Sequence, residues 1–131
     1  PILHNFHSFT EGAAFNIALP KAGMRVKRVI EKPQVMGLIT CDIHGWMHSF
    51  VGVLEHPFFA TTGADGRFEI HGLPPGEYTL EFWHAILGSK QQKVVVAANE
   101  IASAGMSYKE SELPAKGMRP RLKPRFSPLG W

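Results

Sequence analysis

A chain of 131 residues that is 44% hydrophobic and 11% aromatic has room for one ordinary domain or two very small ones, and this composition excludes a disordered protein. Its formal net charge of +3 originates at the end of the chain, because residues 1–112 hold nine basic and eleven acidic side chains. The single cysteine excludes an intramolecular disulfide. Thirteen glycines and ten prolines lie between short β-branched and aromatic runs, which favours an all-β fold.

The first part of the chain consists of short apolar runs separated by glycine and proline. No helical period is sustained there, and each run has the length of a strand. The runs that predict strands are residues 3–9, 14–20, 24–30, 34–41 and 49–55.

A second unit is expected over residues 56–109. The stretch Gly-Ala-Asp-Gly at 63–66 predicts a hairpin turn, and Pro-Pro-Gly at 74–76 predicts another turn. Apolar and polar side chains alternate over residues 78–82, which is the period of a half-buried strand. The run at 90–99 predicts one more strand.

Residues 110–131 predict an extended, basic, proline-rich tail without a core of its own. A basic tail suits an acidic partner surface or nucleic acid, and a solvated disordered tail is the alternative. We expect the tail to dock on another subunit, and we expect no nucleic-acid partner and no transmembrane segment. The tail residues expected at this docking surface are Arg119, Arg121, Arg125 and Trp131.

The motif Cys41-x-x-His44-x-x-Met47 carries the one cysteine of the chain. A soft thiolate, two imidazoles and a weak thioether are the ligands of trigonal copper sites that transfer electrons, and His4 is the candidate second histidine. Taken singly, a buried cysteine is most often a small hydrophobic residue, and a nearby methionine is most often part of a core. The combined spacing favours the metal site.

Two stretches, PILHNFHSF and TCDIHGWMHSFVGVL, resemble the ligand-bearing segments of cupredoxins of the amicyanin and plastocyanin type. The resemblance covers residues 1–55 and implies a Greek-key β-sandwich that binds one copper ion. It also implies that the backbone amide of Asn5 donates to the cysteine sulfur, a contact that tunes the reduction potential. The metal ligands that the resemblance implies are His4, Cys41, His44 and Met47.

The chain departs from the cupredoxin pattern in two places. Gly45 stands where amicyanin has a proline, which is expected to loosen the ligand loop. A complete cupredoxin also has strands before its first histidine ligand, so we expect a processed or truncated start at Pro1, or replacement of those strands by the second unit. Trp46 is expected either to pack the loop or to form an apolar patch where a redox partner docks.

The stretch TTGADGRFEIHGLPPGEYTLEF resembles the carboxypeptidase regulatory-like domain, a small transthyretin-like β-sandwich. The resemblance covers residues 56–109 and implies a module that is usually noncatalytic. The resemblance therefore predicts the fold of the second unit and implies no enzymatic activity.

The resemblances together predict an exported copper protein, periplasmic or extracellular, that transfers single electrons and turns over no substrate. Its expected partner is a cytochrome or an oxidoreductase complex. One alternative is a noncatalytic accessory subunit of a larger extracytoplasmic complex, with a vestigial or empty copper site. Another alternative is a copper carrier, which requires an exchangeable site.

Overall fold

The computed structural model of the chain describes residues 3–114 and contains no α-helix over that range. The predicted fold class is confirmed in its coarse form, because the described residues form antiparallel sheets. The elements are β1 (His4–Thr10), β2 (Ala13–Leu19), β3 (Gln34–Thr40), β4 (His48–Val53), β5 (Gly76–His84), β6 (Gly88–Val96) and the 3-10 helix η1 (Glu110–Glu112).

Contacts along the chain divide it into two compact units, the first reaching Pro57 and the second beginning at Phe58. Over residues 3–114, no helix is long and apolar enough to cross a membrane. The expected docking residues of the tail lie outside the described residues: Arg119, Arg121, Arg125 and Trp131.

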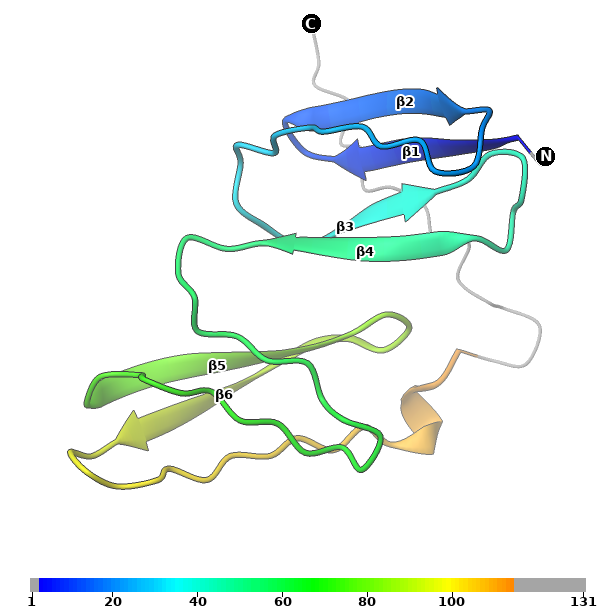
Figure 1. Cartoon of the computed structure of the whole chain (residues 1–131). Coiled ribbons are helices and arrows are strands. Elements are labelled where there is room, and N and C mark those ends of the chain that lie inside the picture. The colour runs from blue at the N-terminus through cyan, green and yellow to red at the C-terminus, as the bar shows by residue number, and fades with distance from the viewer. Residues whose placement is uncertain (1–2, 115–131) are drawn as a thin grey trace, which may run out of the picture. The chain divides into compact units, whose positions relative to one another are not determined.

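The first unit is built on a four-stranded sheet with the order β2-β1-β3-β4 (Figure 1). β1 and β2 form a hairpin that is paired over all seven residues of each strand. β1 and β3 pair at His7 with Thr40 and at Ser8 with Ile39. Because these strands are antiparallel, the start of β1 lies at the end where β3 stops and the 41–47 loop begins.

The pairing register also determines which side chains share a face of the sheet. Side chains alternate between the two faces, and cross-strand partners lie on the same face. His4 therefore shares a face with Ser8, and the Ser8 partner Ile39 shares that face with Cys41, two residues further on. The fold thus brings His4 and Cys41 to one face at one end of the sheet, although they are 37 positions apart in the sequence.

The first unit is tightly packed near β1. Leu38 and Cys41 are buried, and so are Ser8 and Thr10. The Ser8 and Thr10 hydroxyl groups hydrogen-bond to each other, and Thr10 Oγ1 donates to the carbonyl of Ala13 at 2.9 Å. These bonds satisfy hydroxyl groups that have lost contact with water.

Gly37→Ala is expected to destabilise the first unit by about 1–3 kcal/mol, because overpacking in a dense region costs about that much. A Cβ atom at Gly37 would overlap Cγ2 of the buried Thr10. Urea unfolding measures the effect. Gly52→Ala is the matched control in the same sheet, since its Cβ would lie at an ordinary 3.7 Å from the Met36 side chain. Equal stability of the two variants would contradict the packing described here.

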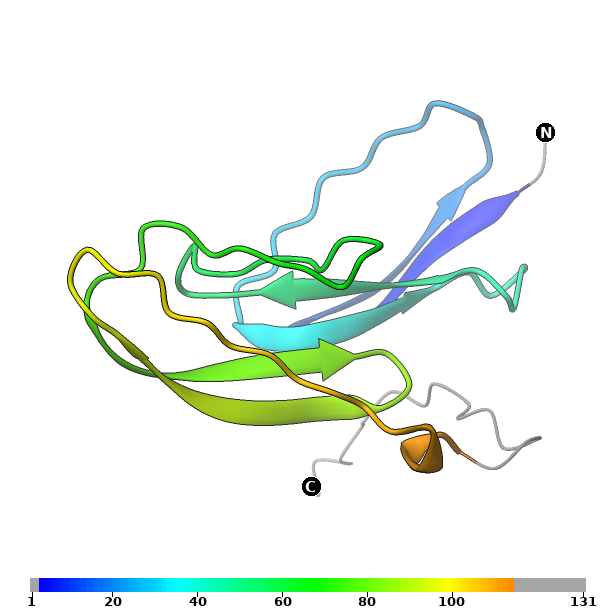
Figure 2. The same cartoon turned by 90° about the horizontal axis from the view of Figure 1, so that it is seen from below.

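The predicted strand at 24–30 is wrong. This segment belongs to the connection between β2 and β3, which follows an extended path without strand pairing (Figure 2). Val29 is 80% exposed, and Met24 and Val26 are exposed as well. Apolar and basic residues alternate over residues 24–27, which suits a strand, but a strand also requires a hydrogen-bonded neighbour.

The second unit is built on the β5–β6 hairpin, which is paired in register from Gly76 with Val96 to His84 with Gly88. The expected turn at 63–66 is present, with a hydrogen bond from the Gly63 amide to the Arg67 carbonyl at 2.8 Å. The segments on either side of that turn are not strands.

The segment that follows β6 runs beside the hairpin (Figures 1 and 2). The Tyr108 hydroxyl lies 3.1 Å from the carbonyl oxygens of Phe82 and Gly88. Lys90 Nζ pairs with Glu112 Oε1 at 2.7 Å. These contacts hold the segment between β6 and η1 against the β5–β6 hairpin.

Candidate metal centre

Two side chains of the loop after β3 and one from the start of β1 converge at one end of the first sheet. His4 begins β1, Cys41 follows β3, and His44 lies in the loop before β4. The Cys41 Sγ atom lies 3.5 Å from His44 Nδ1 and 3.9 Å from His4 Nδ1. One ligand atom from each residue lies within 4.8 Å of the other two, so the group can hold a metal ion.

The distances suit a metal with three protein ligands. For zinc, metal–nitrogen and metal–sulfur bonds are about 2.0 and 2.3 Å, which places nitrogen and sulfur about 3.5–3.7 Å apart around a tetrahedral or trigonal ion. The observed separations of 3.5 and 3.9 Å lie close to these values. Two imidazoles and a thiolate also form a donor set that copper accepts.

The ligand loop is closed by its own backbone. The Cys41 amide donates to the Met47 carbonyl at 3.1 Å, and the Met47 amide donates to the His44 carbonyl at 2.8 Å. The imidazole rings of His4 and His44 pack against each other, with their centroids 4.6 Å apart. The positions of these side chains are therefore held by the fold.

The environment of Cys41 favours the thiolate. A hydrogen bond from the Asn5 backbone amide is the largest cause that lowers the pKa of Cys41 from 9.0 to about 6. Hydrogen bonds from the backbone and side chain of His44 and from the side chain of His4 lower this pKa further, while desolvation by burial opposes them. Since the thiolate is the form that binds metals, the site is prepared for a metal at neutral pH.

This shift predicts how the stability of the metal-free protein depends on pH. The pKa of Cys41 is lower in the folded state, so ionisation favours folding fully above about pH 9, and the benefit disappears as the pH falls to about 6. We expect the difference in unfolding free energy between wild type and Cys41→Ser to increase from pH 6 to pH 9. Urea unfolding with a metal chelator measures this difference. A constant difference across that range would contradict a lowered pKa.

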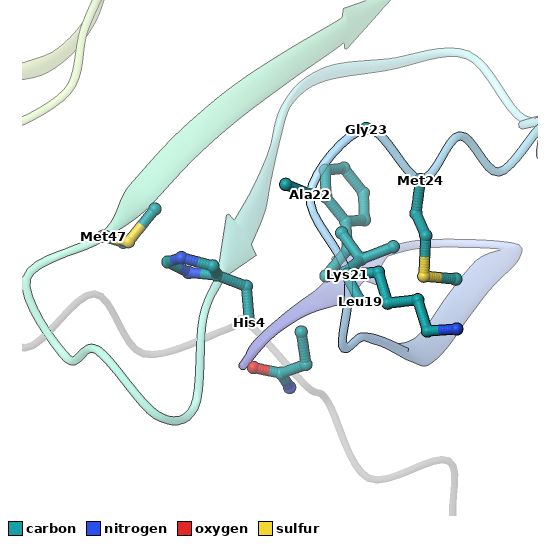
Figure 3. A pocket seen from close by; sticks show the side chains of 9 residues that line it. His4, Leu19, Lys21, Ala22, Gly23, Met24 and Met47 are labelled. Atoms are coloured by element: carbon teal, nitrogen blue, oxygen red, sulfur yellow. The ribbon is translucent and has the colours of Figure 1, made fainter. Parts of the chain in front are cut away.

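Met47 and Trp46 lie in the same loop at the surface. Met47 is 42% exposed and lines a cavity of about 500 Å³ together with His4, Leu19 and Met24 (Figure 3). Trp46 is 76% exposed, and its ring packs against the His44 ring in a T-shaped arrangement with a centroid distance of 5.3 Å. The expected thioether ligand and the expected docking residue thus lie next to the histidine–cysteine group.

The remaining histidines lie outside the group of possible ligands. Within residues 3–114, that group consists of His4, Cys41 and His44. His7 instead bonds Asp42, with Nδ1 2.8 Å from Oδ1. The other histidines outside the group are His48, His56, His71 and His84.

Sequence reasoning missed Asp42. Its carboxylate accepts hydrogen bonds from the side-chain amides of Asn5 and Asn16 and bonds His7. The hydrogen bond with His7 is the largest cause that lowers the pKa of Asp42, followed by the hydrogen bond from Asn16. The alternation of Asn5 and His7 along β1 was a usable signal, because it places two polar side chains on one face.

Fold and site together define a class: residues 3–114 form a β protein whose first unit carries a histidine–cysteine–histidine group able to hold a metal ion. Comparisons with protein-family profiles, with curated proteins and with solved structures find no match. The arguments about function that follow therefore depend on the residues of this chain.

Proposed function

We propose that this chain is an exported mononuclear copper protein that transfers single electrons to or from a redox partner. The observation that carries the proposal is the convergence of His4 Nδ1 and His44 Nδ1 on the Cys41 sulfur. The Cys-x-x-His-x-x-Met spacing and the cupredoxin resemblance of residues 1–55 support copper in particular.

Each residue of the centre has a role in this proposal. His4, Cys41 and His44 would hold the metal through two imidazoles and a thiolate, and Met47 would add a weak thioether ligand. Bound copper would supply the one-electron couple between its cupric and cuprous states. The backbone amide of Asn5 stabilises negative charge on the Cys41 sulfur and so adjusts the reduction potential.

The loop geometry favours electron transfer over copper transport. A carrier has to release its metal, and release is easiest from a flexible, accessible site. Here Cys41 is 4% exposed, and two backbone hydrogen bonds close the loop around it. A preformed site changes little when its metal changes oxidation state, which lowers the reorganisation energy.

The partner surface in this proposal is the exposed edge of the loop. Trp46 packs against His44, so a partner that covers Trp46 comes close to a metal ligand. Exposed aromatic residues are frequent binding hot spots. A cytochrome or an oxidoreductase complex in the periplasm or outside the cell is the partner class that fits an exported electron carrier.

Voltammetry of the copper-loaded chain tests the proposal. We expect a reversible one-electron wave that is unchanged over repeated cycles, because the fold holds the ligands in both oxidation states. The matched control is His48→Ala, which removes a histidine outside the ligand group. Copper that leaves the protein on reduction would support a carrier and contradict an electron-transfer protein.

A specific observation favours a second candidate, a noncatalytic accessory subunit of a larger extracytoplasmic complex. Among the described residues, the buried apolar side chains are Leu38 and Cys41, which is a small core for two units. Apolar surface left uncovered by a chain marks sites of assembly. In this candidate the copper site is vestigial, and the second unit is a carboxypeptidase regulatory-like scaffold.

Deleting residues 115–131 tests the accessory-subunit candidate. If the basic tail is an attachment arm, we expect the shortened protein to fold normally and to lose its complex, since Arg119, Arg121 and Trp131 supply charges and an aromatic anchor. Affinity purification of the tagged full-length and shortened chains measures the loss. Equal recovery of the complex would exclude the tail as the attachment.

A further inference from the structure

Asp42 connects the ligand loop to two strands of the sheet. Its Oδ2 atom accepts from Asn5 Nδ2 at 2.7 Å and from Asn16 Nδ2 at 2.8 Å, and its Oδ1 atom lies 2.8 Å from His7 Nδ1. Its backbone amide also donates to Asn5 Oδ1 at 2.7 Å. One residue of the loop is thus bonded to both β1 and β2.

These bonds form on the face opposite the histidine–cysteine group. His7 pairs with Thr40 in β3 and with Asn16 in β2, so the side chains of Asn5, His7 and Asn16 share a face. Asp42 follows Cys41 and points to that face, while the Cys41 sulfur points to His4. The carboxylate therefore fixes the backbone next to the sulfur from the far side of the sheet.

We infer that Asp42 is a positioning residue that holds Cys41 in place for metal binding through its bonds with His7 and Asn16. The inference goes beyond the ligand set but rests on the proposed metal site. The carboxylate acts through geometry: it fixes the start of the loop so that the Cys41 sulfur faces the backbone amide of Asn5 and the two imidazoles. Asp42 itself does not touch the metal.

The arrangement also explains why an amide is a poor substitute for this carboxylate. Oδ2 accepts from two amide NH₂ groups at once, whereas the side chain introduced by Asp42→Asn has a single carbonyl oxygen for Asn5, Asn16 and His7 together. The new NH₂ group would then face His7 Nδ1, so it would be bonded only in the tautomer whose Nδ1 accepts, and the bonds to a charged carboxylate would be lost. The substitution thus keeps the size of the side chain and removes part of the bonding.

Hydrogen exchange of the metal-free protein, followed by NMR, tests the inference without copper. Hydrogen bonds to a charged group are stronger than those between neutral groups, so we expect Asp42→Asn to accelerate exchange of the Cys41 and Met47 amides about tenfold. Exchange at Leu38, within β3, should stay unchanged. Glu11→Gln is the matched control, because its carboxylate pairs with Lys32 at the surface, away from the ligand loop.

A second readout separates positioning from general stabilisation. In copper-loaded Asp42→Asn we expect an altered visible thiolate-to-copper band and an altered reduction potential, whereas Glu11→Gln should match the wild type. Unchanged exchange at Cys41 and Met47 in Asp42→Asn overturns the inference, and so does equal acceleration throughout the sheet. If Asp42→Asn accelerates exchange only at Cys41 and Met47 while the wild-type chain binds no copper, the positioning of Cys41 is supported and the proposed copper function is contradicted.

Discussion

Cys41→Ala is expected to abolish the intense visible band of the copper-loaded protein and to weaken copper binding by more than about 100-fold. That band requires charge transfer from a thiolate to Cu(II), and the sulfur of Cys41, the single cysteine of the chain, lies 3.5 Å from His44 Nδ1 and 3.9 Å from His4 Nδ1. Loss of a contact outside the ligand set already weakens metal binding by about 10–100-fold, so loss of a ligand should cost more. Spectrophotometric copper titration measures both effects.

Two methionine variants are matched controls for this result. Met47→Leu removes the proposed thioether ligand and is expected to keep the visible band while shifting the reduction potential. Met24→Leu removes a thioether that lines the same cavity but lies outside the ligand motif, so it should change neither property. A visible band that survives in Cys41→Ala would show that the sulfur of Cys41 is not a ligand.

Copper is expected to raise the thermal stability of the first unit strongly. A ligand that binds the folded state alone stabilises it by about 2.7 kcal/mol at a free concentration about 100 times its Kd. For a domain of about 60–100 residues, each kcal/mol raises the Tm by about 4–8 °C. The first unit, which reaches Pro57, should therefore gain about 10–20 °C.

The reason for this large effect is the small core of the metal-free unit. Leu38 and Cys41 are its buried apolar side chains among the described residues, and the ligand loop is held mainly by hydrogen bonds. A metal bound to His4, Cys41 and His44 would join β1 to the loop directly. NMR signals of β1–β4 at increasing temperature follow this unit separately from the second.

The control for this prediction is Cys41→Ala measured at the same copper concentration. Its Tm should not increase, since binding through one or two histidines alone also occurs in the unfolded chain. A wild-type Tm that stays constant in excess copper would mean that the group does not bind the metal in the folded state.

The strands of the first sheet were largely predictable because their apolar runs are interrupted by glycine and proline. The run at 24–30 has the same local pattern and is not a strand. The local sequence indicates whether a segment is suited to a sheet, but the fold of the whole unit determines whether a neighbouring strand is there to form hydrogen bonds with it. Residues 24–30 lack such a neighbour, whereas the runs that form β1–β4 have one.

The part of the candidate site that depends on the spacing of residues along the chain was predictable from the sequence. Cys41 and His44 are three residues apart in one loop, and the structure brings them together with His4. The alternation of Asn5 and His7 was visible in the sequence, but their pairing with Asp42 was not, because it depends on the register between β1 and β3, whose paired residues lie far apart in the sequence. Asn16 joins this network through a second register, that between β1 and β2.

Titration of the metal-free full chain with Cu(II), followed by visible and electron paramagnetic resonance spectroscopy, tests the central claim most directly. The account predicts that one equivalent of copper is bound per chain, with an intense thiolate band and a single cupric signal that saturate together. Binding without that band, or spectra that keep changing beyond one equivalent, would contradict a copper centre formed by His4, Cys41 and His44.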